Sequence, residues 1–175
     1  MSNSGPPFVV RVERRSTGRG IADTAGTTLE EVVGVAGGNA AVVRAIEEAW
    51  DEGKLDELDQ HFAPGFDNSQ SGMPGLPPGL EGSKMAHQGT MQAFPDRRVE
   101  ILDVLEDGDK VFVRNRVSGT NQGGFPPFNV PANGKPFTIE SWSVYRLEDG
   151  KVVEHWGMND AIALLMQLGA IPVPS

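Results

Sequence analysis

The segment EHWGMND, Glu154 to Asp160, brings a histidine, a tryptophan and an aspartate together just before a short apolar helix. Asp160 could act as a general base near pH 7, because a carboxylate in an apolar cavity has a raised pKa. The same aspartate could instead cap the helix, where N–H bonds and the helix dipole lower the pKa. If Asn159 is the cap, Asp160 is free to face the concave side of a sheet. The pattern leaves both alternatives open.

His155 is the second candidate, and a hairpin turn at Asp149-Gly150 sets its direction. Counting the ladder from a two-residue turn places Val144 opposite His155. The face that results is the more apolar one and holds Trp142, Val144, Val153 and His155. We therefore predict that His155 points inward, either into a functional pocket or as a core histidine bonded to a carbonyl.

A second hairpin, around Asp107-Gly108, predicts that Asn115 is also an inward polar residue. The same count places on one face the residues Leu102, Val104, Val111, Val113, Asn115 and Val117. A slip of one residue in either hairpin would reverse these assignments.

The three histidines do not have the spacing of a metal site. His61, His87 and His155 form no i, i+4 pair and no HExxH-type motif, so we expect no metal. Zero cysteines exclude thiolate ligands, disulfides and a cysteine nucleophile. His61 is expected at the surface or at the rim of the fold, and His87 lies on a predicted helix.

Composition narrows the class of protein further. The chain has 175 residues, of which 38% are hydrophobic, which suits one globular domain. Its net charge of −9 opposes binding to nucleic acid or to anionic membranes. No apolar stretch is long enough to span a bilayer, and we expect a cytoplasmic protein.

The elements expected to position the candidates are three helices, a loop and four antiparallel strands. Residues 1–38 predict a flexible extension with one short helix over residues 27–33, and residues 39–175 predict the folded domain. The predicted elements are helices over 39–52, 54–62 and 83–94, a Gly- and Pro-rich loop over 69–82, hairpins over 99–117 and 137–156, and a last helix before Gly169.

Five motifs carry a resemblance to a known family. They are AFPDRRVEI (93–101), SGTNQGGF (118–125), PANGKPF (131–137), RLEDGKVVEHW (146–156) and QLG (167–169). In this order and spacing, the chain resembles the SnoaL-like polyketide cyclases, or ester cyclases, of the nuclear transport factor 2-like superfamily. The resemblance covers about residues 39–172. It implies a cone-shaped α+β barrel, with a curved antiparallel sheet on three N-terminal helices and a short C-terminal helix.

The resemblance also implies a cavity enzyme without metal or organic cofactor. The aspartate after the EHW segment, which matches Asp160, would remove a proton from carbon between two carbonyls and return it after an intramolecular aldol step. Inward His155, Asn115 and Trp142 would polarise a carbonyl or form an aromatic wall.

Two asparagines depart from the family pattern. Asn68 and Asn121 stand where many relatives have histidine; they can orient an enolate but cannot exchange a proton near pH 7. With His87 they complete the expected substrate-binding set.

We expect a homodimeric cyclase that acts on a polyketide-like or other hydrophobic small molecule. The alternatives are a small-molecule-binding or dimerisation module of the same fold and a related isomerase or hydrolase. Catalysis by Asp160 requires it inside the pocket, whereas a binding module tolerates it as an exposed cap.

Overall fold

The computed structural model describes residues 38–68 and 75–172. Its helices are α1 (Asn39–Glu52), α2 (Gly79–Ala93) and α3 (Ala161–Leu168), with short 3-10 helices η2 (Leu55–Gln60) and η3 (Pro126–Phe128). The predicted extension lies outside the described residues apart from Gly38, and so does the helix predicted over residues 27–33. The domain boundary at residue 38 stays a prediction.

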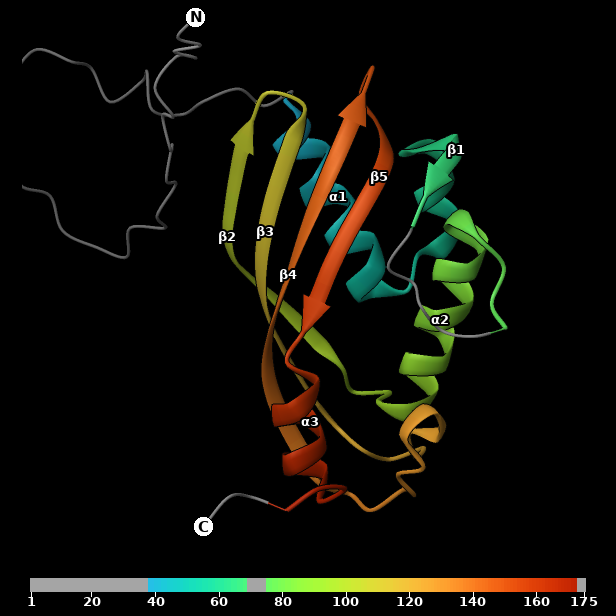
Figure 1. Cartoon of the computed structure of the whole chain (residues 1–175), viewed down its shortest axis with the longest axis vertical. Helices are drawn as coiled ribbons and strands as arrows, with labels where there is room; N and C mark the ends of the chain where they lie inside the picture. Colours follow the sequence, from blue (N-terminus) through green and yellow to red (C-terminus); the bar gives the residue numbers. More distant parts are fainter. Residues whose placement is uncertain (1–37, 69–74, 173–175) are drawn as a thin grey trace, which may run out of the picture.

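Five strands form one curved mixed sheet with the order β1-β5-β4-β3-β2. They are β1 (Phe62–Asp67), β2 (Arg98–Asp107), β3 (Lys110–Thr120), β4 (Pro136–Glu148) and β5 (Lys151–Asn159). The last four pair antiparallel, as the sequence predicts, and β1 adds a parallel pair with β5. Figure 1 shows α1 and α2 on one side of the sheet and α3 at its lower end. The predicted α+β class with a curved sheet is confirmed.

The region before α2 corrects the prediction of three N-terminal helices. The second of them is only the 3-10 helix η2, and Phe62 begins the strand β1 instead of ending a helix. Phe62 and Phe66 are the buried residues of this strand. Phe62 lies four residues after Leu58 and so continues the helical spacing of η2, but its pairing with Val152 of β5 makes it the first residue of a strand.

The β4–β5 hairpin has the predicted turn but a different register. Glu148 pairs with Lys151 across Asp149-Gly150, and then a bulge leaves Val153 without a partner. Beyond the bulge, His155 pairs with Tyr145 instead of Val144. One extra residue exchanges the two faces of a strand.

This bulge corrects the predicted partners of His155 on the inward face. His155 shares that face with Tyr145, whereas Trp142 and Val144 lie on the other face with Trp156 and Met158. The inward direction of His155 is confirmed by its ring contact with buried Tyr145.

The β2–β3 hairpin keeps the predicted inward stripe except at one position. Its turn lies at Gly108-Asp109, a shift that leaves the faces unchanged. A bulge at Leu102 then places Ile101 opposite Asn115, and Ile101 packs on the core in place of Leu102. Asn115 points inward, as predicted.

Two apolar clusters fill the inward side of the sheet. One cluster joins α1 to β1 and to the parts of β2, β3, β4 and β5 near the two hairpin turns. The other joins α3 to the opposite ends of β3 and β4. Between them, the inward face is polar. The strand pairing places there the residues Asn115, Ser141, Ser143, His155, Gly157 and Asn159, which we name the polar band. The core is thus interrupted where three strands present polar groups or no side chain.

Candidate active site

A cavity of about 320 Å³ lies against the polar band. The residues that line it come from α1, α2, the end of β1, β4 and β5. They are Trp50, Asn68, Ser83, Ala86, His87, Thr90, Trp142, Ser143, His155, Gly157, Met158 and Asn159. Trp142, a predicted site residue, and Met158 border the cavity although the strand pairing places both on the other face of the sheet. None of the lining residues carries a carboxylate, so the imidazoles of His87 and His155 are the ionisable side chains of the wall.

His155 enters the cavity wall from β5. Burial lowers the pKa of its imidazole to about 4, so the ring is neutral at pH 7. Its Nδ1 lies 3.4 Å from the Asn68 Oδ1, and its ring packs on Tyr145 with centroids 4.7 Å apart. The Nε2 atom is buried and has no hydrogen-bond partner in the described part of the chain. A buried nitrogen of this kind is an open site for a ligand proton.

Gly157 keeps the space beside this nitrogen empty. A Cβ at position 157 would stand 3.4 Å from the His155 Nε2 and 3.3 Å from the Ser143 Oγ. Because Gly157 and His155 point the same way along β5, any larger side chain would fill the cavity next to the imidazole.

His87 lines the same cavity from α2. Its ring lies 4.9 Å from that of Trp50. Burial lowers its pKa to about 4, with a further contribution from the positive charge of Arg97, while a hydrogen bond to the backbone of Trp50 opposes the shift. Its Nε2 is likewise buried without a partner among residues 38–68 and 75–172. The cavity therefore has two neutral imidazoles with open nitrogen atoms.

Asn68 also lies where the sequence predicts, at the cavity. Its Nδ2 donates to the Ser83 Oγ over 2.6 Å. The amide therefore links His155 to the first turns of α2.

Glu47 is a buried carboxyl that is not among the residues predicted from the sequence. It accepts hydrogen bonds from the Tyr145 hydroxyl (2.8 Å) and the Asn115 Nδ2 (3.0 Å). Burial raises its pKa, although both hydrogen bonds and the charge of Arg97 lower it. A signal was present, since Glu47 lies four residues after Val43 on the buried face of α1.

Asn115 is thus placed inward but does not line the cavity. Its Nδ2 is bonded to Glu47, and its Oδ1 is buried without a partner in the described part of the chain. Its first role is to hold the buried carboxyl against the sheet.

Asn121 is placed away from the cavity. It is fully buried, donates from Nδ2 to the Pro131 carbonyl (2.8 Å), and accepts at Oδ1 from the Gly124 N–H (3.0 Å). These bonds close the loop that follows β3. The sequence predicts that Asn121 contacts the substrate, whereas in the structure its side chain holds this loop.

Asp160 is the N-cap of α3. Its Oδ1 accepts a hydrogen bond from the Ala163 N–H over 2.9 Å, and the residue is exposed. Asn159, and not Asp160, is among the residues that line the cavity. Of the two alternatives for this aspartate, the geometry is that of the cap.

His61 lies at the end of η2 and outside both cavities described here. Burial and the charge of Lys151 lower its pKa, while Glu57 opposes the shift. This agrees with the expected rim position.

A second, largely apolar cavity of about 460 Å³ adjoins the first. Ala86 and Thr90 of α2 line both cavities, so the two cavities lie next to each other along this helix. Its other walls include Leu76 and Met85, and on the opposite side Phe125 and Pro126. Leu76 lies in the Gly- and Pro-rich segment before α2, and Phe125 lies in the loop after β3.

The described residues contain neither a metal-ligand cluster nor a membrane-spanning helix. Within residues 38–68 and 75–172, no three His, Asp or Glu side chains are grouped so that they could hold a metal ion. Over the same residues, the helices are too short or too polar to cross a bilayer.

The chain is similar to known proteins in sequence and in fold. A family model described as SnoaL-like polyketide cyclase matches residues 40–168. IdmH from Streptomyces antibioticus, proposed to be a polyketide cyclase, is 31% identical with a TM-score of 0.65, over 75% of this chain and 98% of that one.

Two further Streptomyces structures are similar. TsrD from Streptomyces laurentii is 28% identical with a TM-score of 0.65, over 75% of this chain and 97% of its own. AclR from Streptomyces galilaeus, proposed to be a hydroxylase, is 26% identical with a TM-score of 0.67, over 78% and 84%. A comparison with curated protein sequences gave no match.

Proposed function

Because the chain belongs to the SnoaL-like polyketide cyclase family, we propose that it is a cofactor-independent cyclase that acts on a polyketide-like or other hydrophobic small molecule. The reaction would be an intramolecular aldol addition. The observation that carries this proposal is the cavity beside the polar band, whose wall presents the neutral His155 with an unpartnered Nε2.

The proposed step needs one proton acceptor and no external reagent. The His155 Nε2 takes a proton from carbon between two carbonyls, which leaves an enolate and an imidazolium. The enolate carbon attacks a ketone of the same molecule, forming a C–C bond and an alkoxide. The imidazolium returns its proton to that alkoxide, so atoms and charge balance.

Neutral imidazole suits this chemistry because it is fully in the base form at pH 7. A pKa of about 4 makes it a weak base in isolation, but the enolate that forms beside it stabilises the imidazolium. A doubly activated carbon acid needs an accurately placed base more than a strong one.

The adjoining apolar cavity supports a hydrophobic substrate. Its walls of Met85, Phe125 and Pro126 can receive an alkyl or aromatic part while the activated carbon lies near His155. A flexible substrate held across both cavities would lose the conformational freedom that opposes ring closure.

The role of Asp160 as general base stays a prediction. Its position as an exposed cap supports the alternative in which it stabilises α3. An Asp160→Asn variant separates the two, because asparagine also caps helices but cannot take up a proton.

Turnover of a panel of polyketide methyl esters and other 1,3-dicarbonyl compounds tests the proposal. We expect wild type to cyclise at least one, His155→Gln to lose about 10²- to 10⁴-fold in kcat, and Asp160→Asn to lose little. Circular dichroism checks that each variant is folded. Binding without turnover by wild type would favour the binding module, and a loss confined to Asp160→Asn would assign the base to the aspartate.

A homodimer and a cytoplasmic location also stay proposals. What supports the dimer is the uncovered face of the sheet, where Trp142 and Met158 are 40% and 57% exposed. Sedimentation of the full chain would test it.

A further inference from the structure

Three polar contacts connect His155 to the start of α2. The Ser83 Oγ lies 3.1 Å from the Gly79 carbonyl oxygen, the Asn68 Nδ2 lies 2.6 Å from the Ser83 Oγ, and the Asn68 Oδ1 lies 3.4 Å from the His155 Nδ1. The residues come from α2, the end of β1 and β5, and meet only in the folded protein.

The available protons determine which group donates and which accepts in each of these three contacts. The Gly79 carbonyl can only accept, so the single hydroxyl proton of Ser83 is donated to it. The Ser83 oxygen must then accept from the amide nitrogen of Asn68. This turns the amide oxygen of Asn68 toward His155, and an oxygen can pair only with a protonated Nδ1.

A neutral imidazole carries one proton, so a protonated Nδ1 leaves Nε2 as a lone pair. This is the nitrogen that is buried without a partner in the described part of the chain and that lies beside Gly157. Free neutral imidazole side chains in water favour the other tautomer, with the proton on Nε2. The protein environment must therefore supply the preference.

We propose that Ser83 is a positioning residue that, through Asn68, holds His155 as the Nδ1–H tautomer and so keeps the Nε2 lone pair open to the cavity. The inference rests on the proposed role of His155 as the base. Ser83 does not touch the reacting atoms; it acts by accepting from the Asn68 Nδ2, which directs the amide oxygen of Asn68 toward His155.

The backbone before α2 is built to place this hydroxyl. Gly79 has a φ of +74°, which favours glycine, and a Cβ at Gly82 would come within 1.8 Å of the Pro77 carbonyl oxygen. The chain therefore folds back closely on itself one turn before Ser83. His87, on the same helix and in the same cavity, has no such amide among its described contacts.

The tautomer can be measured directly by 15N NMR of the histidine side chains, without any substrate. The chain has three histidines, so His61 and His87 serve as internal references. At pH 7 we expect wild-type His155 to show a protonated Nδ1 and an unprotonated Nε2. Ser83→Ala should move it toward a mixture of tautomers, and Ser83→Thr, which keeps the hydroxyl, should restore the wild-type spectrum.

Thr90→Val is the matched control. Thr90 lies on α2, lines the same cavity and makes the same kind of bond, from Oγ1 to the Ala86 carbonyl over 3.0 Å, but it is not part of the Ser83–Asn68 chain. Its removal should leave the His155 tautomer unchanged. A protonated Nε2 in wild type, or an unchanged spectrum in Ser83→Ala, would overturn the proposal.

Turnover then separates this inference from the proposed function. With a substrate that the wild type cyclises, Ser83→Ala should lower kcat about two- to ten-fold, as expected for one hydrogen bond, with little change in KM. A tautomer shift without any loss of kcat would confirm the positioning of the imidazole and reject His155 as the base. A loss of kcat without a tautomer shift would reject the positioning role.

Discussion

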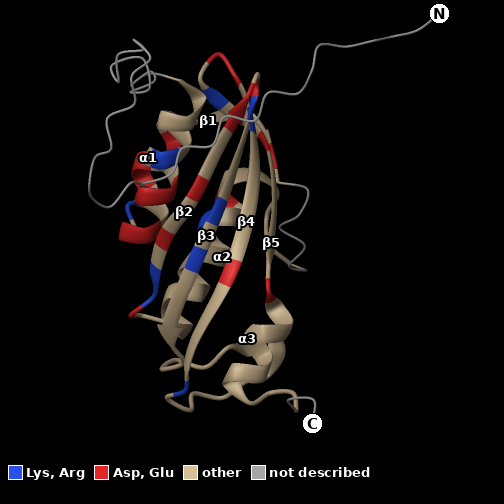
Figure 2. Cartoon of the chain, turned by 90° about the vertical axis from the view of Figure 1, so that its left-hand side faces the viewer, with Lys and Arg blue, Asp and Glu red and all other residues tan. Residues whose placement is uncertain are grey.

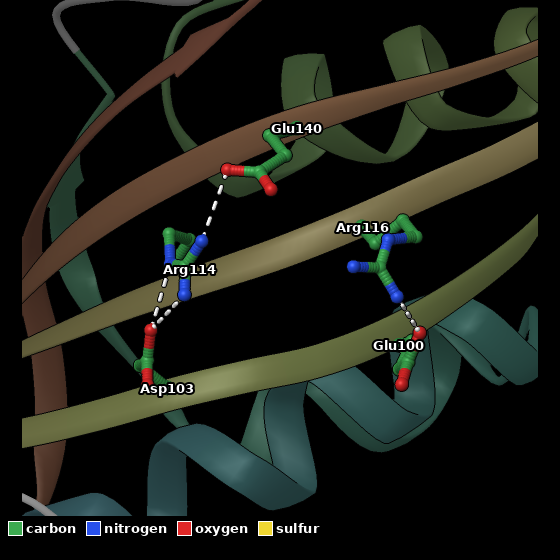
Figure 3. Close-up of polar contacts among 5 residues, drawn as sticks. All are labelled: Glu100, Asp103, Arg114, Arg116 and Glu140. Atoms are coloured by element: carbon green, nitrogen blue, oxygen red, sulfur yellow. Dashed lines mark hydrogen bonds and ion pairs between the residues drawn. The ribbon is translucent and has the colours of Figure 1, made fainter.

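The two faces of the sheet differ in how their polar groups are paired. On the uncovered face, arginines of β3 lie between carboxylates of β2 and β4, which form alternating rows of charge (Figure 2). Arg114 bridges Asp103 (2.6 Å) and Glu140 (3.1 Å), and Arg116 pairs with Glu100 (2.7 Å; Figure 3). On the inward face, the Asn115 Oδ1 and the His155 Nε2 are buried without partners in the described part of the chain.

The difference teaches where to look for chemistry. Water screens the outer charges, so their pairing contributes little free energy and their number is a poor guide to function. An unpartnered polar atom in the dry interior costs far more, and a protein that retains one there has a use for it. The inner face has fewer polar groups, but each of them matters more to stability or to binding.

The largest expected effect on stability is at Glu47. Glu47→Ala leaves the Tyr145 hydroxyl and the Asn115 amide buried without their acceptor, which should cost roughly 4 kcal/mol of unfolding free energy. Glu48, its exposed neighbour on α1, is the matched control, and Glu48→Ala should change stability by less than about 0.5 kcal/mol. Urea denaturation measures both. Equal effects would contradict the asymmetry between the faces.

A pH titration of stability should show the buried imidazole of His155. Its pKa is lowered from 6.5 to about 4 in the folded state, so the unfolded chain binds more protons between these values. Stability should therefore fall as pH is lowered from about 6.5 to 4, by up to about 3 kcal/mol from this group.

The difference between wild type and His155→Gln isolates that contribution. Outer carboxylates such as Glu154, whose pKa the hydrogen-bonded Arg146 lowers, cancel in the subtraction. If the two proteins lose stability in parallel over this range, His155 is not buried as a neutral group.

A smaller effect is expected at the cap of α3. Asp160→Ala removes the bond to the Ala163 N–H and should lower stability by about 1 kcal/mol, whereas Asp160→Asn should change it little because asparagine also caps. Thermal unfolding followed by circular dichroism compares the pair. A more stable Asp160→Ala would mean that the carboxylate is held in strain, as a catalytic group can be.

The smallest effect is expected on the uncovered face. A double-mutant cycle of Arg116→Ala and Glu100→Ala should give a coupling below about 1 kcal/mol that weakens at high salt. A larger, salt-independent coupling in the full chain would show that this pair is buried, as it would be if a second copy covered the face.

Much of the fold could be predicted from local patterns. The Asp149-Gly150 turn, the inward stripe of β3 and the Gly169 end of α3 all follow from short-range rules. The bulges at Leu102 and Val153 could not be predicted, because nothing in the alternation marks an extra residue. The predicted face is therefore wrong for Trp142 and correct for His155.

The candidate site was harder to predict than the fold. Asn68 and His155 were both named, but their contact through β1 depends on a parallel strand that the apolar spacing did not reveal. Glu47 resembled a surface charge by residue type, although its helical position marks it as buried. Asp160 fitted two positions equally well, and only the geometry of the α3 terminus distinguishes them.

The measurement that tests the central claim most directly is a 15N NMR titration of the wild-type histidines with a non-cyclising 1,3-diketone. We predict that the His155 Nε2 resonance moves on binding as that nitrogen gains a hydrogen-bond donor, while His61, outside both cavities, stays fixed. Binding that leaves the His155 Nε2 unchanged would contradict the assignment of this cavity as the active site.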